Sequence, residues 1–176
     1  KAPLRAWAYS KADGIAMAGT ILGVLLAGVE AGILAGVIAS LALFLRHSAR
    51  PHMAVVGQVP GSEHFRNVDR HRVAVSDTVL TVRIDESLYF ANARALEDRI
   101  SSLVACRPSL RHVVLMCPAV NLIDLSALES LEAINRRLAE AGISFHLSEV
   151  KGPVMDRLAR SHFLDELTGR VFLSQH

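Results

Sequence analysis

The 32 residues from Gly14 to Leu45 read GIAMAGTILGVLLAGVEAGILAGVIASLALFL and contain one charged residue, Glu30. An apolar run of 18 or more residues is typical of a transmembrane helix. As one straight helix the run would be roughly 48 Å long, and fitting it into about 30 Å of hydrocarbon would require a tilt beyond the usual range. We therefore expect two short membrane helices, about residues 13–28 and 31–45, joined by a glycine-containing turn at Gly28–Gly32.

Basic residues flank this run on both sides: Lys1, Arg5 and Lys11 precede it, and Arg46 and Arg50 follow it. Under the positive-inside rule both outer ends lie on the cytoplasmic side, so the rest of the chain should be cytoplasmic too. The helices are rich in small residues, which permit close packing of membrane helices. We therefore interpret residues 1–50 as the terminal part of a larger transmembrane domain, with further membrane helices upstream.

Glu30 has two interpretations. Ionisable residues inside membranes are often functional, so Glu30 is a candidate intramembrane polar site. Its place at the predicted turn favours the simpler alternative, in which the carboxylate reaches the membrane surface and is solvated.

The charge distribution separates the chain into two parts. Of its 19 Lys and Arg and 17 Asp and Glu, residues 1–52 carry five and two, which leaves fourteen and fifteen for the remainder. No block of like charges suggests a nucleic-acid partner. Residues 51–71 contain Gly57, Pro60 and Gly61 and are predicted to be a linker.

Residues 72–176 show the pattern of an α/β domain. Leu80, Val82 and Ile84 alternate with polar residues as in a half-buried strand, and residues 72–75 are a candidate edge partner. Helical spacing, with Asn92 as a candidate N-cap, then alternates with short apolar runs. The elements expected after the first two strands are a helix ending before Pro108, a strand at 112–117, a helix closed by Gly142, a strand near Phe145, a helix opened by Gly152-Pro153, and a strand at 171–173. This order predicts a mixed, largely parallel sheet with helices packed on it.

Two stretches of this domain resemble the STAS domain of SulP (sulfate permease) transporters. They are RIDESLYFAN at Arg83–Asn92 and NLIDLSAL at Asn121–Leu128, and they occur in the expected order. Gly142–Phe145 and Val150–Val154 look like the family's next strand and last helix. The resemblance implies a membrane α-helical hairpin followed by an α/β STAS domain at residues 72–176.

The resemblance also implies a function. The chain would be the C-terminal part of a secondary-active inorganic anion transporter of the sulfate or bicarbonate type, multi-pass in the cell (inner) membrane. The STAS domain would serve regulation, assembly or partner binding, with a homodimer and a regulatory protein or nucleotide as the implied partners. The anion site is expected upstream of this chain. The alternative is a membrane-tethered STAS signalling module that binds a partner and transports nothing.

Asp124 and Ser126 form the candidate site of the STAS domain. In the related anti-sigma-factor antagonists the serine two residues after the aspartate is phosphorylated, and a phosphate at a helix start is favourably placed. The alternative is structural, because Ser126-Ala127-Leu128-Glu129 has the pattern of a capping box. In that case Asp124 is a further candidate for helix capping or for a surface recognition loop. We favour the structural alternative, since Leu125 and Ala127 differ from the antagonists' Asp-Ser-Ser-Gly.

No catalytic, metal or cofactor site is predicted. The eight histidines show no metal-ligand spacing, and no nucleophile motif or glycine-rich phosphate loop is present in the sequence. Cys106 and Cys117 form no C-x-x-C pair and are expected to be reduced packing thiols. The sequence thus indicates a protein that is not an enzyme.

Overall fold

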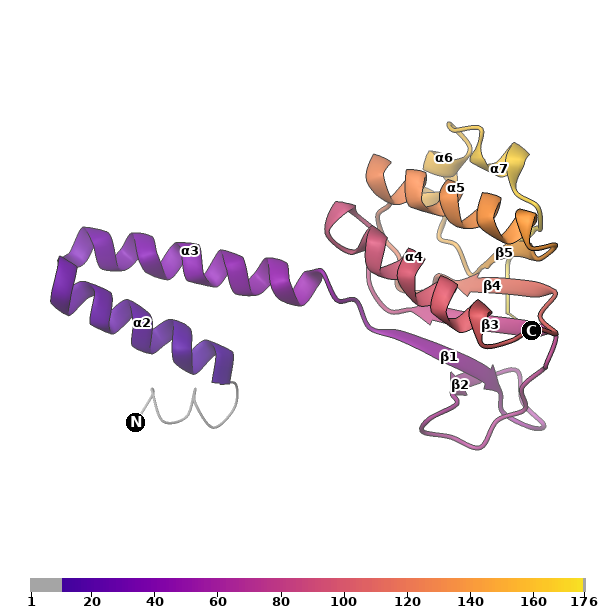
Figure 1. The fold of residues 1–176 in the computed structure, drawn as a ribbon, viewed down its shortest axis with the longest axis horizontal. Coiled ribbons are helices and arrows are strands. Elements are labelled where there is room, and N and C mark those ends of the chain that lie inside the picture. The colour runs from indigo at the N-terminus through magenta and orange to yellow at the C-terminus, as the bar shows by residue number, and fades with distance from the viewer. Residues whose placement is uncertain (1–10, 176) are drawn as a thin grey trace. The chain divides into compact units, whose positions relative to one another are not determined.

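The computed structural model describes residues 11–175. The chain divides into two compact units, with the boundary between Ala49 and Arg50. Lys1 and Arg5, predicted to flank the first membrane helix, lie outside the described residues. The first unit is a pair of helices, and the second is an α/β domain (Figure 1).

The first unit confirms the expected hairpin of two helices, α2 (Lys11–Ala27) and α3 (Val29–Ser48). The reversal is tighter than predicted, because Gly28 alone breaks the helix. Its φ of 89° lies in the left-handed region that glycine adopts readily. Glu30 therefore lies in the first turn of α3 rather than in a loop.

Glycine lets the two helices of the hairpin pack closely. A Cβ on Gly32 would lie 2.5 Å from the backbone nitrogen of Val24 on α2, and one on Gly36 would lie 2.6 Å from Oγ1 of Thr20. Side chains at these positions would push the helices apart, which agrees with the predicted role of the small residues.

The outer surface of the hairpin is apolar and uncovered. Its large side chains stay exposed, up to 84% for Leu26 and 65% for Phe44. Among the described residues, Val29–Arg46 in α3 has the length and composition of a membrane span, and Gly14–Leu26 in α2 is a shorter apolar stretch. With 20 residues, α3 is about 30 Å long, the thickness of a bilayer's hydrocarbon core.

The second unit is built on a six-stranded sheet in the order β2-β1-β3-β4-β5-β6. The strands are β1 (Met53–Gln58), β2 (Phe65–Asn67), β3 (Val79–Ile84), β4 (His112–Met116), β5 (Ser144–Ser148) and β6 (Val171–Phe172). β1 pairs antiparallel with β2 and β3, whereas β3 to β6 are parallel. The sheet is therefore mixed and largely parallel, as predicted.

The predicted linker at residues 51–71 is wrong, because this segment contributes β1 and β2. Ala54 and Val56 are 3% and 4% exposed, so one face of β1 is buried as in any inner strand. The predicted pairing of residues 72–75 with β3 is also wrong, since β1 occupies that edge and Ala74 forms only an isolated bridge with Gln58. Gly57 makes this bridge possible, because a Cβ there would lie 2.5 Å from the carbonyl oxygen of Ala74.

Four helices follow the strands in sequence: α4 (Phe90–Ala105), α5 (Leu125–Glu140), α6 (Gly152–Leu158) and α7 (Phe163–Glu166). Three of them match the predicted helices, whereas α7 was not predicted. The turn after α5 is made by Gly142 with φ 70°, and Pro153 lies in the first turn of α6.

Helices α4 and α5 pack on one face of the sheet and against each other (Figure 1). Leu96 and Leu131 from these helices share one buried cluster with Val82, Leu115 and Phe145 from the strands. A buried polar contact joins the two helices.

This contact is centred on Glu97 of α4, which is 7% exposed. The Ser130 hydroxyl of α5 donates to Glu97 Oε1 at 2.7 Å, and Arg137 Nη1 lies 3.3 Å from Oε2. The buried carboxylate is thus both hydrogen-bonded and paired, as its desolvation requires.

The opposite face of the sheet carries a smaller apolar cluster of Ala54, Val56 and Met116. The end of the chain is attached to this face through Gln175, which accepts a hydrogen bond from the Ser148 hydroxyl and donates one to Oγ1 of Thr81. These bonds tie the last described residue to both β3 and β5.

The hairpin packing yields a testable matched pair. Gly32→Ala adds a Cβ against the α2 backbone, so we expect it to destabilise the full-length protein by about 1–3 kcal/mol. Gly19→Ala places the same group where nothing lies within 4 Å. It should be neutral or stabilise by up to about 1 kcal/mol through helix propensity. Thermal unfolding in detergent measures both, and equal effects of the two substitutions would contradict the packing.

Candidate functional site

Asp124 joins the N-termini of the two helices that cover the sheet. Its Oδ1 accepts a hydrogen bond from the Ala127 N–H of α5 at 2.9 Å, and its Oδ2 accepts one from the Phe90 N–H of α4 at 2.9 Å. Free N–H groups and the positive end of the dipole favour a carboxylate at a helix start. One side chain thus caps two helices, and its bond to α4 joins residues that are 34 positions apart in the sequence.

Backbone pairing brings Asp124 to this position. Residues 118–124 leave the end of β4 and run beside the segment before α4, where Leu88 forms a parallel bridge with Ile123. The Leu88 N–H donates to the Leu122 carbonyl at 2.9 Å, and the Asp124 N–H donates to the Leu88 carbonyl at 3.3 Å. Leu88 is 0% exposed, so burial fixes the register of the pairing.

Two basic side chains from the α6 region hold the same loop. Lys151 Nζ lies 2.6 Å from Oδ1 of Asn121, and Arg157 Nη1 donates to the Ile123 carbonyl at 3.3 Å. The Asn121 N–H donates in turn to Oγ of Ser87 at 3.1 Å. We call residues 118–124 with this surrounding network the Asp124 loop.

The predicted capping box at Ser126–Glu129 is wrong. Asp124 is the N-cap, and α5 begins at Leu125, so Ser126 is the second helical residue. Neither the Ser126 hydroxyl nor the Glu129 carboxylate makes a capping hydrogen bond in the described structure. Asp124 and Ser126 do lie within one helical turn, as expected, with Ser126 half-buried.

The predicted N-cap at Asn92 is also wrong, because the N-cap of α4 is Tyr89, about one turn earlier. Helix α4 begins at Phe90, and Asn92 lies inside it with 0% exposure. Its side chain accepts from the Tyr89 N–H at 3.0 Å and donates to the Ser87 carbonyl at 2.9 Å. Asn92 therefore stabilises the turn that leads into α4 from within the helix.

Three exposed apolar residues are neighbours of Asp124, either along the chain or through its hydrogen bond to the Phe90 N–H. Phe90 and Leu125, the first residues of α4 and α5, are 66% and 70% exposed, and Leu122 is 39% exposed. Because Asp124 bonds the Phe90 N–H and precedes Leu125, both helix starts lie beside it. An apolar surface around a fixed polar loop suits contact with a partner protein.

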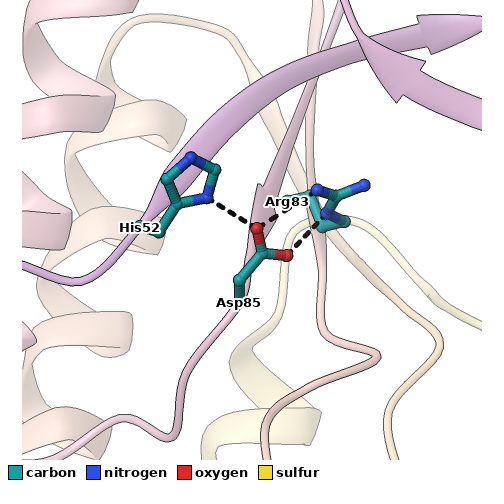
Figure 2. Close-up of polar contacts among 3 residues, drawn as sticks. All are labelled: His52, Arg83 and Asp85. Carbon is teal, nitrogen blue, oxygen red and sulfur yellow. Dashed lines mark hydrogen bonds and ion pairs between the residues drawn. The ribbon is translucent and has the colours of Figure 1, made fainter. Parts of the chain in front are cut away.

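A second polar cluster lies where the chain enters the sheet, and Figure 2 shows its three side chains pointing at one another. His52 Nδ1 lies 2.7 Å from Asp85 Oδ2, and Arg83 Nε donates to Asp85 Oδ1 at 2.6 Å. Arg83 Nη2 also donates to Oδ2 at 3.1 Å, which makes the pair bidentate. The cluster fixes the residue before β1 to the end of β3.

The charge on Asp85 is stabilised by its partners. Partial burial alone would raise the pKa of Asp85, but hydrogen bonds and positive charge from Arg83 and His52 outweigh it and lower the pKa below its usual value. Asp85 is therefore a carboxylate at neutral pH. We interpret the cluster as structural, since both carboxylate oxygens of Asp85 are already hydrogen-bonded.

The other candidate residues show no reactive geometry. Glu30 is exposed and lies in the first turn of α3 in the helical hairpin. Cys106 is exposed, whereas Cys117 is buried, and burial raises the pKa of its thiol to about 12. No group of three metal-ligating side chains occurs within residues 11–175.

Sequence reasoning missed the links between distant segments. Arg83 lies at the end of β3 and Asp85 follows the strand two residues later, a spacing that favours the same face and was visible in the sequence. The partners His52 and Phe90 carry no local signal, because they depend on pairing across the sheet and between two loops.

The comparisons with known proteins agree with this fold. The STAS domain family model matches residues 71–176, which is more than half of the chain. The solved structure of murine Solute Carrier 26 family member A9, an anion transporter in the inward-facing state, has a TM-score of 0.89 at 18% identity. The structural alignment covers 99% of this chain and 29% of the murine chain. At 18% identity, this similarity shows that the two share a fold.

Curated relatives are similar along nearly the whole chain. Sulfate transporter 1.3 of Arabidopsis thaliana is 30% identical over 176 aligned residues, which cover 93% of this chain. High affinity sulfate transporter 2 of Stylosanthes hamata is 28% identical over 96% of this chain. The chain spans only 27% of the length of either relative. From the family match and the fold, the chain belongs to the STAS domain family.

Proposed function

We propose that this chain is the C-terminal part of a secondary-active inorganic anion transporter of the SulP type. Its helical hairpin would complete a larger transmembrane domain, and its STAS domain would serve regulation, assembly or partner binding. The chain's similarity to plant sulfate transporters supports sulfate or a related anion, such as bicarbonate, as the substrate. The anion site would lie on membrane helices upstream.

One observation carries this proposal: an apolar hairpin with uncovered large side chains directly precedes a STAS domain. Exposed apolar surface on this scale is unfavourable in water, at about 25 cal/mol per Å². Lipid removes that cost, and additional helices would cover part of the surface. Two short helices rich in glycine make a poor membrane anchor on their own, so the proposal includes further helices.

The orientation follows from charge. Lys11 is the first residue of α2, Arg46 and Arg50 follow the apolar part of α3, and such residues are retained on the cytoplasmic side. The STAS domain would then be cytoplasmic, attached to the cell membrane, or to the inner membrane in a cell that has two. A homodimer would match the form implied by the resemblance.

A transport assay tests the proposal. We expect the full-length protein containing this chain, reconstituted in proteoliposomes, to take up radiolabelled sulfate or bicarbonate in a saturable way. Chain 1–176 alone should take up neither anion, because the expected substrate site is missing from it. A folded full-length protein that transports neither anion, or a natural product without further membrane helices, would favour the membrane-tethered signalling module.

The Asp124 loop is the proposed partner-binding surface of the STAS domain. A regulatory protein would contact the exposed Phe90, Leu122 and Leu125 around it, and a nucleotide is the alternative ligand. Ser126 remains a proposed phosphorylation site. Its hydroxyl is not used in capping, and its phosphate would lie at the N-terminus of α5, where negative charge is favoured.

Substitutions separate the structural and regulatory roles of this loop. We expect Asp124→Ala to lower the free energy of unfolding by about 2 kcal/mol, since it removes the caps of two helices. Ser126→Ala should stay within about 0.5 kcal/mol. Thermal unfolding of the full-length protein measures both. A large loss of unfolding free energy with Ser126→Ala would show that the Ser126 hydroxyl caps α5.

Partner binding and transport are measured on the same variants. If Ser126 is a phosphorylation switch, Ser126→Asp should change transport or partner binding while Ser126→Ala does not. A Ser126→Asp protein with unchanged transport and partner binding would exclude the switch.

A further inference from the structure

A cavity of about 720 Å³ lies at the other end of the strands from the Asp124 loop. It is formed where the end of β1 and the start of β3 meet two connecting segments, residues 74–77 and 106–109. Its volume falls within the range of about 300–1,000 Å³ that is usual for small-molecule sites. Neither the transport proposal nor the partner surface uses this cavity.

Most of the cavity wall is apolar. Val55, Phe65, Val68 and Val79 line it, together with other residues of β1 and β3. A bare inorganic oxyanion would fill little of this space and would leave apolar surface in contact with water. The wall therefore suits a ligand with an apolar body.

Arg107 supplies the positive charge of the cavity. It is the only cationic residue in the lining, and its Nη1 is buried without a hydrogen-bond partner in the described structure. That nitrogen has no accessible surface, so a ligand would meet the rest of the half-buried guanidinium, whose positive charge attracts an anionic oxygen.

The position of Arg107 is set by its neighbours. Its N–H donates to the Val104 carbonyl at 2.9 Å at the end of α4. Two residues later, the Ser109 hydroxyl donates to the Asp77 carbonyl at 3.1 Å, which ties residues 106–109 to residues 74–77. Arg107 is therefore held at the cavity by backbone contacts on both sides.

The lining contains one acidic residue, Asp77, whose carboxylate could compete for the guanidinium. Asp77 is exposed and forms no ion pair with Arg107 within the described residues. An exposed carboxylate is solvated and screened, so it only modestly weakens the attraction between Arg107 and an approaching anion. The charge of Arg107 thus remains available to a ligand.

We propose that this cavity binds a small amphipathic organic acid, with the ligand's carboxylate, sulfate or phosphate group paired with the Arg107 guanidinium and its apolar body against the β1 and β3 walls. Such a site would let the STAS domain respond to an organic metabolite at a surface separate from the Asp124 loop. The inference does not depend on the transport activity.

Calorimetric titration of chain 1–176 in lipid nanodiscs tests the site with three probes. Naphthalene carboxylate should bind at least about tenfold more tightly than naphthalene methanol, because only the acid carries a charge that pairs with the Arg107 guanidinium. Inorganic sulfate should bind at least about tenfold more weakly than the acid, since it lacks the apolar body. Naphthalene sulfate as a further probe shows which oxyanion the site prefers.

Variants assign the binding to the cavity. Arg107→Gln should remove the difference between acid and alcohol, and Arg107→Lys should keep part of it. Arg111→Gln is the matched control, because Arg111 is exposed and does not line the cavity. Val68→Trp should weaken the binding of both aromatic probes by filling the space. Circular dichroism checks that each variant is folded.

Four results would overturn the inference. They are no binding of the acid by the wild-type chain, unchanged acid binding by a folded Arg107→Gln variant, equal affinity for inorganic sulfate, and an equal heat signal from empty nanodiscs. The last result would mean that the acid only partitions into lipid.

Discussion

The exposed apolar surface of the α2–α3 hairpin is the constraint on which the placement of the whole chain depends. Leu26 and Phe44 remain largely uncovered, and we propose that lipid or other membrane helices bury this surface. Gly32 and Gly36 let the two helices pack without side chains between them. Once the hairpin is placed in a membrane, both of its ends face one side, and the STAS domain lies on that side.

The STAS domain depends on a few side chains that join segments far apart in the sequence. Asp124 caps two helices at once, and Asp85 binds both the strand it follows and the residue before β1. Glu97 does the same between α4 and α5. Each carboxylate is satisfied on both oxygens, which explains how charged groups are tolerated at these packed junctions.

Local patterns predicted most of the fold, because burial on one face leaves a period that the sequence displays. The alternation at Leu80–Ile84 and the apolar run at 112–117 each correspond to a strand. β1 was missed because Gly57 and the turn residues after it resemble a linker, whereas its pairing with β3 is long-range. Asp124 and Ser126 were both expected in a helix-cap loop, and Asp124 is the N-cap of α5 through a local bond to Ala127. Its second bond, to the Phe90 N–H of α4, joins distant segments and has no local pattern to reveal it.

Membrane topology tests the central claim most directly. Native Cys106 is exposed in the STAS domain, whereas Glu30→Cys, made in a Cys106→Ser background, would place a thiol at the hairpin turn. Labelling of the full-length protein with a membrane-impermeant maleimide should modify Cys106 only in inverted vesicles and the Glu30→Cys thiol only in intact cells. Labelling of both thiols from the same side, or release of the protein from membranes by carbonate, would contradict the account.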